Sequence, residues 1–326
     1  MIKRLQFYTD EGVNPHENLA KESYLLEHVG EDTCLLYLWQ NRNTVVIGRN
    51  QNALAECRVE LLAAEGGTLA RRLSGGGAVF HDLGNLNFTF LCTDVNFDIH
   101  RQMCVIREAC RLAGIETELS GRNDILADGR KFSGNAFYHS GGRAYHHGTL
   151  LISADIGKMQ RYLTPPKAKL AAKGIQSVKS RVLNLAELSP GLTPEAMKGH
   201  LLSAFGAVYG LMPEDYGPIP EAAIAETARR YGSTEYLYDF QIPYDVRLLG
   251  LTGFGYVDWQ LQIEGGCIRD MSLYTDSLET ELPALVREAL LGLHFDLTTV
   301  KEALLTRLPR EVADELSSLL EKQVFG

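Results

Sequence analysis

The 326-residue sequence contains no run of the roughly 18 apolar residues that a membrane-spanning helix requires. Its first five residues, MIKRL, also lack the apolar core of a secretory signal. Basic side chains are outnumbered, because 32 Lys and Arg stand against 41 Asp and Glu, for a net charge of −9. A general nucleic-acid binder is usually basic. We therefore expect a soluble, cytoplasmic protein that binds neither membranes nor nucleic acid.

Cysteine is sparse and unpatterned. No Cys-x-x-Cys pair and no zinc-site spacing occurs, and most of the six cysteines stand among apolar neighbours, as buried free thiols in a reducing compartment do. The six are Cys34, Cys57, Cys92, Cys104, Cys110 and Cys267. The remaining composition is that of an ordinary globular protein, 45% hydrophobic and 22% charged. The chain is long enough for one large domain and a small one.

One stretch, RRLSGGGAVFHD at residues 71–82, combines two guanidiniums with three glycines. Arginine carries a permanent charge and binds phosphate or carboxylate oxygens in pairs. Consecutive glycines let the backbone approach a ligand closely and turn its N–H groups toward an anion. Alone, the stretch predicts only that an anion binds here. A solvent-facing turn with two basic residues is the alternative.

The first 150 residues alternate predicted strands with predicted helices. Asp128-Gly129 and Gly141-Gly142 each predict the turn of a hairpin. This succession is typical of an α+β fold rather than a regular βαβ repeat. The expected helices are 14–29, 59–65 and 99–113, the expected strands are 34–39, 43–50, 87–91 and 147–152, and the hairpins cover 124–132 and 138–145.

The rest of the chain predicts two more helices and then a smaller unit. The basic, proline-led residues 165–175 predict an ordered connecting loop that could face the substrate, with a plain surface linker as the alternative. The polar, aromatic stretch 232–249 marks the best boundary, and we divide the chain into domains 1–246 and 247–326. Helices are expected at 194–209, 220–231, 279–293, 297–307 and 310–322, and strands at 254–263 and 267–275.

Four ordered segments carry a family resemblance: RRLSGGGAVFHD with GN at 71–85, GRND at 121–124, RKFSGNA at 130–136 and HHGTLL at 146–151. Together they resemble lipoate–protein ligase A, a family of the biotin/lipoate protein ligase superfamily. LAAKGI at 170–175 and SVKSRV at 177–182 extend the match. YTDSL at 274–278 is similar to the C-terminal accessory domain of the long, two-domain members. The resemblance is strong over 40–185 and loose after 210.

The resemblance implies an α+β fold, with a mixed-sheet biotin/lipoate ligase catalytic domain and a small α+β C-terminal accessory domain. It also implies a two-step reaction. Lipoate and ATP give lipoyl-AMP and pyrophosphate, and the lipoyl group then passes to a lysine amine. The implied acceptors are lipoyl domains of 2-oxoacid dehydrogenase E2 subunits and the glycine cleavage H protein, and the small-molecule substrate is lipoate or octanoate.

Cations are needed in the first step, because a carboxylate must approach a polyphosphate. The candidates are Arg72, Lys131 and a divalent ion. One unit charge about 4 Å from another is worth on the order of 4 kcal/mol at an effective dielectric near 20, which corresponds to roughly a thousandfold in rate. By resemblance, Lys131 is the catalytic residue and contacts both the lipoate carboxyl and the α-phosphate. A strand lysine facing water is the alternative.

Other residues receive roles by resemblance. Asp124 is the Mg²⁺ candidate, since Mg²⁺ prefers one or two carboxylates with phosphate oxygens, and a capping or turn role is its alternative. Val79 and Phe80 would cover the adenine, unless they are ordinary core residues. The ATP-binding set is Arg72, Gly77, Ala78, Val79, Phe80, Asn85 and Lys131. The lipoate-binding set is Arg72, Ser74, Gly76, His81, Lys131, His147 and Gly148.

Proton transfer has no clear candidate. Structural roles are more typical of His81, His146 and His147, and we expect His81 to line the acyl pocket. In the second step the acyl phosphate is already activated, so we expect that the enzyme needs only to position the amine.

Three other functions remain in competition. A related acyltransferase that works without ATP depends on a cysteine carrier near the active lysine, but no cysteine occurs between Cys110 and Cys267. A biotin ligase would have a nucleotide loop richer in Gly-Arg repeats. A non-catalytic sensing or acceptor-binding module would lack Lys131 or the glycine loop, and both are present.

Overall fold

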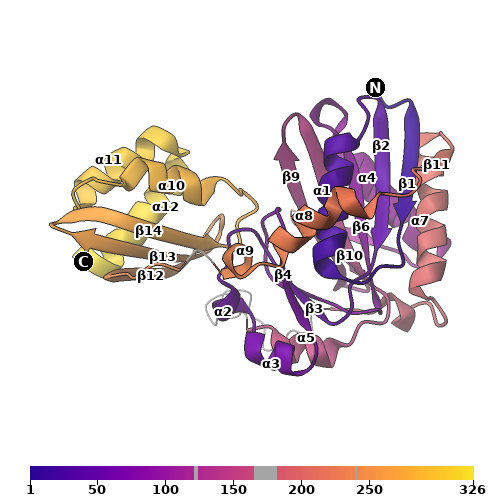
Figure 1. Ribbon diagram of the computed structural model, residues 1–326, viewed down its shortest axis with the longest axis horizontal. Helices are drawn as coiled ribbons and strands as arrows, with labels where there is room; N and C mark the ends of the chain where they lie inside the picture. The colour runs from indigo at the N-terminus through magenta and orange to yellow at the C-terminus, as the bar shows by residue number, and fades with distance from the viewer. Residues whose placement is uncertain (121–123, 165–181, 239–240) are drawn as a thin grey trace.

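The computed structural model describes residues 1–120, 124–164, 182–238 and 241–326. Figure 1 shows a larger part built around a sheet and a smaller part formed by the C-terminal residues. The predicted connecting loop at 165–175, the motif residues 177–181, and Gly121, Arg122 and Asn123 lie outside the described residues.

Within the described residues, eight strands form a mixed sheet in the order β11-β1-β2-β6-β10-β9-β8-β7. β1 runs parallel to β2 and β11, and the other neighbours run antiparallel. The strands are β1 (Arg4–Thr9), β2 (Thr33–Trp39), β6 (Asn85–Thr93), β7 (Glu118–Ser120), β8 (Asp124–Ala127), β9 (Arg130–Ser140), β10 (Arg143–Leu151) and β11 (Pro213–Asp215). Both predicted hairpin turns, at Asp128-Gly129 and Gly141-Gly142, connect strands of this sheet.

Helices lie on both faces of this sheet and in the C-terminal part (Figure 1). They are α1 (Pro15–His28), α2 (Ala53–Glu56), α3 (Val59–Ala64), α4 (Ile99–Leu112), α5 (Ile156–Tyr162), α7 (Pro194–Tyr209), α8 (Glu221–Tyr231), α9 (Thr234–Tyr238), α10 (Leu282–Leu290), α11 (Leu297–Arg307) and α12 (Arg310–Leu320), with short turns η1 (Asp94–Asn96), η2 (Leu185–Glu187) and η3 (Glu321–Phe325). No helix in the described ranges is both long and apolar enough to cross a bilayer.

The helix boundaries follow from capping residues. The side chain of Asn14 accepts a hydrogen bond from the backbone N–H of His16, and Pro15 occupies the first turn of α1, where a missing N–H costs little. Thr193 caps α7 in the same way, and Gly210 ends that helix with a φ of 69°. Each predicted helix overlaps an observed one, whereas the short helices α2, α5 and α9 were not predicted.

Alternation along β6 gives the main sheet two different faces. Leu86, Phe88 and Phe90 belong to the apolar core that α4 and α7 cover. Asn87 and Thr89 lie on the opposite face, where Oγ1 of Thr89 donates to Oε1 of Glu22 on α1 at 2.7 Å. The second face is therefore partly polar, and this polarity places the functional site there.

Three short strands form a separate sheet beside this second face, in the order β4-β3-β5 among the described residues. They are β3 (Thr44–Ile47), β4 (Thr68–Arg71) and β5 (Val79–His81). β3 is parallel to β4 and antiparallel to β5. The loop from β4 to β5, residues 72–78, contains the three consecutive glycines, and we call it the glycine loop.

The C-terminal part has its own core. Strands β12 (Val246–Thr252), β13 (Gly255–Glu264) and β14 (Cys267–Thr275) form an antiparallel sheet within the described residues, covered by α10, α11 and α12. Strand β12 begins inside the stretch 232–249 that the sequence marked as a boundary. The division into 1–246 and 247–326 remains a prediction.

Candidate active site

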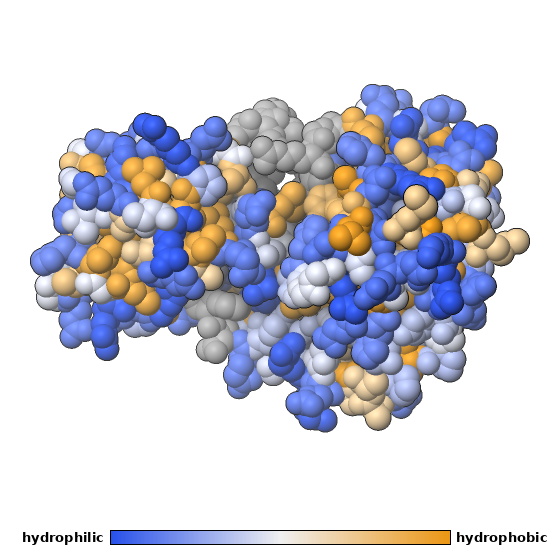
Figure 2. Space-filling model, turned by 90° about the horizontal axis from the view of Figure 1, so that it is seen from above, coloured by the Kyte–Doolittle hydropathy of each residue, from blue (hydrophilic) through white to orange (hydrophobic). Residues whose placement is uncertain are grey.

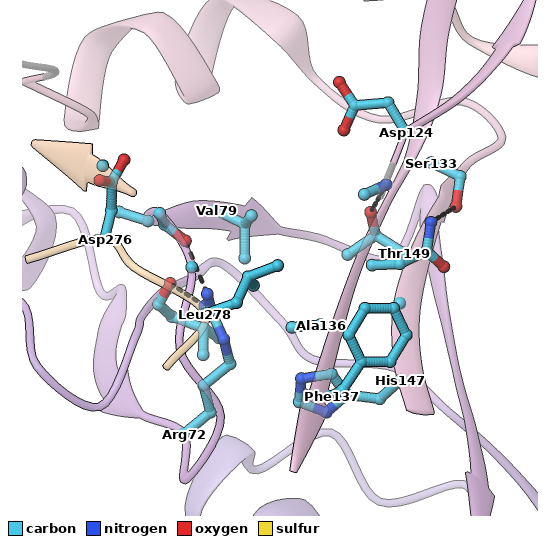
Figure 3. A pocket seen from close by; sticks show the side chains of 18 of the residues that line it. Arg72, Val79, Asp124, Ser133, Ala136, Phe137, His147, Thr149, Asp276 and Leu278 are labelled. Carbon is cyan, nitrogen blue, oxygen red and sulfur yellow. Dashed lines mark hydrogen bonds between the residues drawn. The ribbon is translucent and has the colours of Figure 1, made fainter. Parts of the chain in front are cut away.

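A cleft of about 1440 Å³ lies where three parts of the chain meet. Strands β9 and β10 form one wall, the glycine loop forms the second, and residues 276–281 of the C-terminal part form the third (Figure 3). All but two of the predicted site residues line it. The lining ones are Arg72, Gly76, Gly77, Ala78, Val79, Phe80, His81, Asp124, Lys131, His147 and Gly148, and the exceptions are Ser74 and Asn85.

Lys131 forms an ion pair on the sheet wall. Its Nζ lies 2.6 Å from Oδ1 of Asp124, and the two side chains are 36% and 33% exposed. They come from the neighbouring strands β9 and β8, whose register shifts at Ile125/Leu126. An ion pair this exposed contributes little to stability. A ligand carboxylate or phosphate can therefore compete with Asp124 for the amine.

Asp124 is consistent with a phosphate-bound metal ion and not with a metal cage made of protein. No group of three or more His, Cys, Asp or Glu side chains in the described part of the chain is arranged to hold a metal ion. Mg²⁺ binds readily through one or two carboxylates together with phosphate oxygens and waters. A single carboxylate on the cleft wall fits that chemistry.

Arg72 holds the glycine loop together. Its guanidinium donates to the carbonyl oxygens of Gly75 at 2.7 Å, Gly77 at 2.8 Å and Val46 at 3.3 Å, and its Nε donates to Oγ of Ser74 at 3.1 Å. The side chain is buried, and burial lowers the pKa of Arg72 to about 10. The sequence predicted that Arg72 contacts the nucleotide. In the structure its N–H groups shape the loop that lines the cleft.

Arg71 has a comparable role that the sequence reasoning missed. It donates to the carbonyl oxygens of Arg49 and Gln51 at 2.8 Å and to that of Tyr236 at 3.0 Å. It therefore connects the turn after β3 to helix α9. Only the tertiary structure reveals these partners, because they lie far from Arg71 in the sequence.

Two glycines of the loop are required by their surroundings. Gly76 has a φ of 91°, which favours glycine, and its N–H donates to the carbonyl of Ser277 at 3.2 Å. A Cβ on Gly75 would lie 2.2 Å from that same carbonyl oxygen. The loop thus fits closely against the C-terminal part.

The C-terminal part also contacts the turn after β3. The backbone N–H of Thr275 donates to the carbonyl of Asn50 at 2.9 Å, and Nδ2 of Asn50 donates to the carbonyl of Thr280 at 2.8 Å. In Figure 3, Asp276 and Leu278 lie beside Arg72 across the cleft from Phe137 and His147. The sequence did not predict that residues 276–281 would line the site.

His146 and His147 point to opposite faces of β10. Nδ1 of His147 lies 2.9 Å from Oε1 of Glu22, and its Nε2 lies 2.8 Å from Oγ of Ser74. The ring nitrogens of His146 lie 3.1 Å from Oε1 of Gln102 and 2.9 Å from Oδ1 of Asn135. Burial lowers the pKa of His146 to about 3. Both rings are fully engaged, which supports structural roles.

His81 lies on β5 and lines the cleft, where it is buried. Burial, with a smaller contribution from the charge of Arg72, lowers the pKa of His81 to about 3. Its Nδ1 lies 3.1 Å from Nδ2 of Asn41. The ring is therefore neutral at physiological pH and is not a general acid.

The remaining predicted residues divide by burial. Phe80 is in the apolar core and packs against Tyr162 with ring centroids 5.5 Å apart, yet it lines the cleft, as Val79 does. Val79 and Phe80 can therefore pack in the apolar core and contact a ligand at the same time. Asn85 is fully buried outside the cleft and donates to Oδ1 of Asn87 at 2.9 Å. Its position gives no support to a contact with the nucleotide base.

Several lining residues were not predicted. Trp39, Asn87 and Leu19 line the cleft and come from β2, β6 and α1. The positions of Trp39 and Asn87 follow from sheet register, since the two residues pair across β2 and β6. The sequence contains no local signal for this pairing.

None of the six cysteines lines the described cleft. Cys34, Cys57, Cys92 and Cys110 are buried, as predicted, whereas Cys104 is exposed. Burial raises the pKa of Cys57 to about 11 and the pKa of Cys110 to about 12. Thiols of this kind are poor nucleophiles.

Comparison with known proteins gives consistent matches. A family model described as the lipoyl protein ligase A/B catalytic domain matches residues 14–206. A second, described as the bacterial lipoate protein ligase C-terminus, matches residues 243–318. A lipoate-protein ligase A of Bdellovibrio bacteriovorus is 38% identical over 316 residues, which cover 94% of this chain and 93% of that relative.

Two solved structures support the fold. P. falciparum LipL1 in complex with lipoate has a TM-score of 0.81 at 24% identity and covers 98% of this chain and 99% of its own. A lipoate-protein ligase A bound with ATP has a TM-score of 0.62 at 24% identity, over 73% of this chain and 98% of its own. The predicted α+β fold, with a mixed-sheet catalytic domain, is confirmed.

Proposed function

The chain belongs to the lipoate–protein ligase A family, and we propose that it activates lipoate with ATP to lipoyl-AMP and then transfers the lipoyl group to acceptor lysines. The observation that carries this proposal is the placement of Lys131 and the glycine loop on facing walls of one cleft. The first step needs both, because an acid must meet a phosphate.

Lys131 is the residue that brings the two anions together. Its amine is one-third exposed on the cleft wall, and within the described part of the chain its ion pair is with the similarly exposed carboxylate of Asp124. We infer that the lipoate carboxylate and the α-phosphate displace Asp124 and share the ammonium. A charge at this position stabilises the pentacovalent phosphorus by an amount on the order of 4 kcal/mol. Pyrophosphate then leaves, and the acid oxygen is bonded to phosphorus.

The glycine loop would hold the nucleotide. The backbone around Gly77 and Ala78 lines the cleft, and Arg72 keeps its shape by binding the carbonyl oxygens of Gly75 and Gly77. Those bonds turn the loop's carbonyls toward the arginine and leave neighbouring N–H groups for a phosphate. We therefore assign Arg72 a positioning role beside the glycine loop.

Asp124 would hold Mg²⁺ that arrives with ATP. The ion supplies charge neutralisation for the phosphates when it is bound. The same carboxylate that binds Lys131 would then bind the metal ion, which leaves the amine available to the two reacting anions. Among the described residues, this role rests on Asp124 alone.

The second step transfers the acyl group to a lysine amine. Both ring nitrogens of His147 are engaged and burial lowers the pKa of His81, so neither of these two histidines is placed to remove the proton of the incoming amine. We propose that positioning of the amine at the activated carbonyl suffices. The leaving group is AMP, and the amine proton passes to solvent.

The acceptors we propose are lipoyl domains of 2-oxoacid dehydrogenase E2 subunits and the glycine cleavage H protein, modified in the cytoplasm. An acyl transfer without ATP would need a cysteine to carry the acyl group, and no thiol lines the described cleft. The ATP-dependent reaction is therefore the better supported of the two.

Intact-mass measurement of a purified lipoyl domain tests the proposal. Incubation with the protein, lipoate, ATP and Mg²⁺ should add one lipoyl group to the acceptor, and omission of ATP should add none. Transfer from an acyl carrier protein without ATP would instead establish the acyltransferase.

A further inference from the structure

The cleft is lined by two buried hydrogen-bond donors without an acceptor. Nε2 of His81 and Nδ2 of Asn87 have no hydrogen-bond partner among the described residues. Both residues line the cleft, and their side chains are buried at 3% and 1% residue exposure. A buried donor left unpaired costs about 1–3 kcal/mol. Two in one cleft indicate that a ligand supplies the acceptors.

The two donors lie beside the same indole ring. Trp39 is opposite Asn87 in the pairing of β2 with β6, and its ring meets that of His81 edge-on with centroids 6.2 Å apart. Trp39 itself lines the cleft and is 3% exposed. An acid whose carboxylate reaches the more exposed Lys131 would extend its far end toward this deeper group.

A chain of amides determines which nitrogen of His81 carries the proton. Nδ2 of Asn18 faces the backbone carbonyls of Gly12 at 3.1 Å and Gln40 at 2.9 Å, which can only accept. The same Nδ2 donates to Oδ1 of Asn41 at 3.0 Å, so Nδ2 of Asn41 faces His81. An amide nitrogen only donates. Nδ1 of His81 therefore accepts, and the ring proton sits on Nε2.

His147 offers no comparable donor. A carboxylate oxygen of Glu22 accepts from its Nδ1, and Nε2 is engaged with Ser74. Glu22 and Asn18 lie one turn apart on the buried side of α1. One helix thus fixes both histidines, and it leaves a free N–H only on His81.

We propose that His81 and Asn87 form a donor pair that recognises weak acceptor atoms at the far end of the acid, with Asn41 and Asn18 as positioning residues. This inference rests on the proposed function and adds a chemical criterion to it. Ring sulfurs accept hydrogen bonds weakly, whereas methyl and methylene groups do not accept them. An acid whose chain ends in sulfur provides acceptors for the two donors, whereas an alkyl chain of similar length leaves both donors without an acceptor.

Nitrogen-15 NMR of the histidine rings tests the tautomer without any turnover. Wild-type protein should show His81 neutral, with the proton on Nε2, throughout the pH range in which the protein is folded. In the Asn41→Asp variant a carboxylate faces Nδ1, so Nδ1 should gain a proton. A wild-type ring already protonated at Nδ1 would overturn the inference.

Acid-dependent exchange of pyrophosphate into ATP tests the selectivity. We expect wild-type kcat/KM to favour lipoate over octanoate by about tenfold, the equivalent of about 1.4 kcal/mol. In His81→Leu and in Asn87→Leu the preference should fall to about twofold or less, since the unpaired donor is gone. Val46→Ala is the matched control, because it shortens an apolar lining side chain that both acids would contact.

The outcomes separate this inference from the proposed function. If both acids support exchange and the preference for lipoate is the same in the wild type and in the two leucine variants, the donor pair is refuted and the proposed function stands. A Val46→Ala variant that loses the preference as fully as His81→Leu also refutes it. Exchange with neither acid refutes the proposed function itself.

Discussion

Replacing Lys131 with alanine should abolish formation of lipoyl-AMP and leave the fold intact. The amine is paired with Asp124 at 2.6 Å, and both side chains are about one-third exposed. Loss of the pair returns a carboxylate to water, so the free energy of unfolding should change by less than about 1 kcal/mol. Loss of a charge about 4 Å from the reacting phosphate costs on the order of 4 kcal/mol in the transition state, or roughly a thousandfold in rate.

Arg130 provides a matched control on the same strand. It is also about one-third exposed and pairs with Glu187 at 3.1 Å, yet it does not line the cleft. Arg130→Ala should therefore keep nearly the full rate. The assay separates AMP and lipoyl-AMP by chromatography after a single turnover, and urea unfolding reports stability. A Lys131→Ala variant within about tenfold of the wild-type rate, or equal to Arg130→Ala, would refute the reasoning.

Four further perturbations test other parts of the account. Arg72→Ala should lower the free energy of unfolding, measured in urea, by about 2–5 kcal/mol and should weaken ATP binding, because several buried carbonyl oxygens lose their donor. Arg72→Lys should not restore ATP binding, since an ammonium group cannot reach the same set of carbonyl oxygens. Gly76→Val should weaken ATP binding by more than its stability cost, which the φ of 91° sets at about 1–3 kcal/mol, and equal losses would make the loop purely structural. In the folded protein the pKa values of His81 and His146 are lowered to about 3, so between about pH 6.5 and pH 3 only the unfolded chain protonates these two rings. The free energy of unfolding should therefore fall by up to about 1.4 kcal/mol per pH unit for each histidine as the pH drops through that range. A free energy of unfolding that does not change with pH there would contradict the burial of the two rings in the neutral form. A protein cut near residue 246 should fail in at least one step, because residues 276–281 line the cleft. Normal catalysis of both steps by the cut protein would disprove this.

Much of the fold was predictable because its signals are local. Caps such as Asn14 and Thr193 and turns such as Asp128-Gly129 fix the ends of elements within a few residues. Short strands such as β4 and β11 were missed, since three or four residues carry too little periodicity. Strand β12 was missed because Leu249 and Leu251 are exposed and break the expected alternation.

A site residue was predictable where a single sequence motif determines both its identity and its place in the cleft. Lys131 and the glycine loop belong to such motifs, and both line the cleft. The role of Arg72 was less accessible, because a buried guanidinium finds its acceptors in backbone carbonyls that the sequence does not display. The same holds for Trp39, Asn87 and Glu22, which reach the site only through sheet register and helix packing.

The most direct test of the central claim is exchange of labelled pyrophosphate into ATP, run separately with lipoate, octanoate and biotin. If the cationic side chains and the glycine loop act together in one cleft that binds the acyl group, exchange should require the acid. It should proceed with lipoate and should not proceed with biotin. Exchange without any acid, or exchange supported by biotin and not by lipoate, would contradict the account.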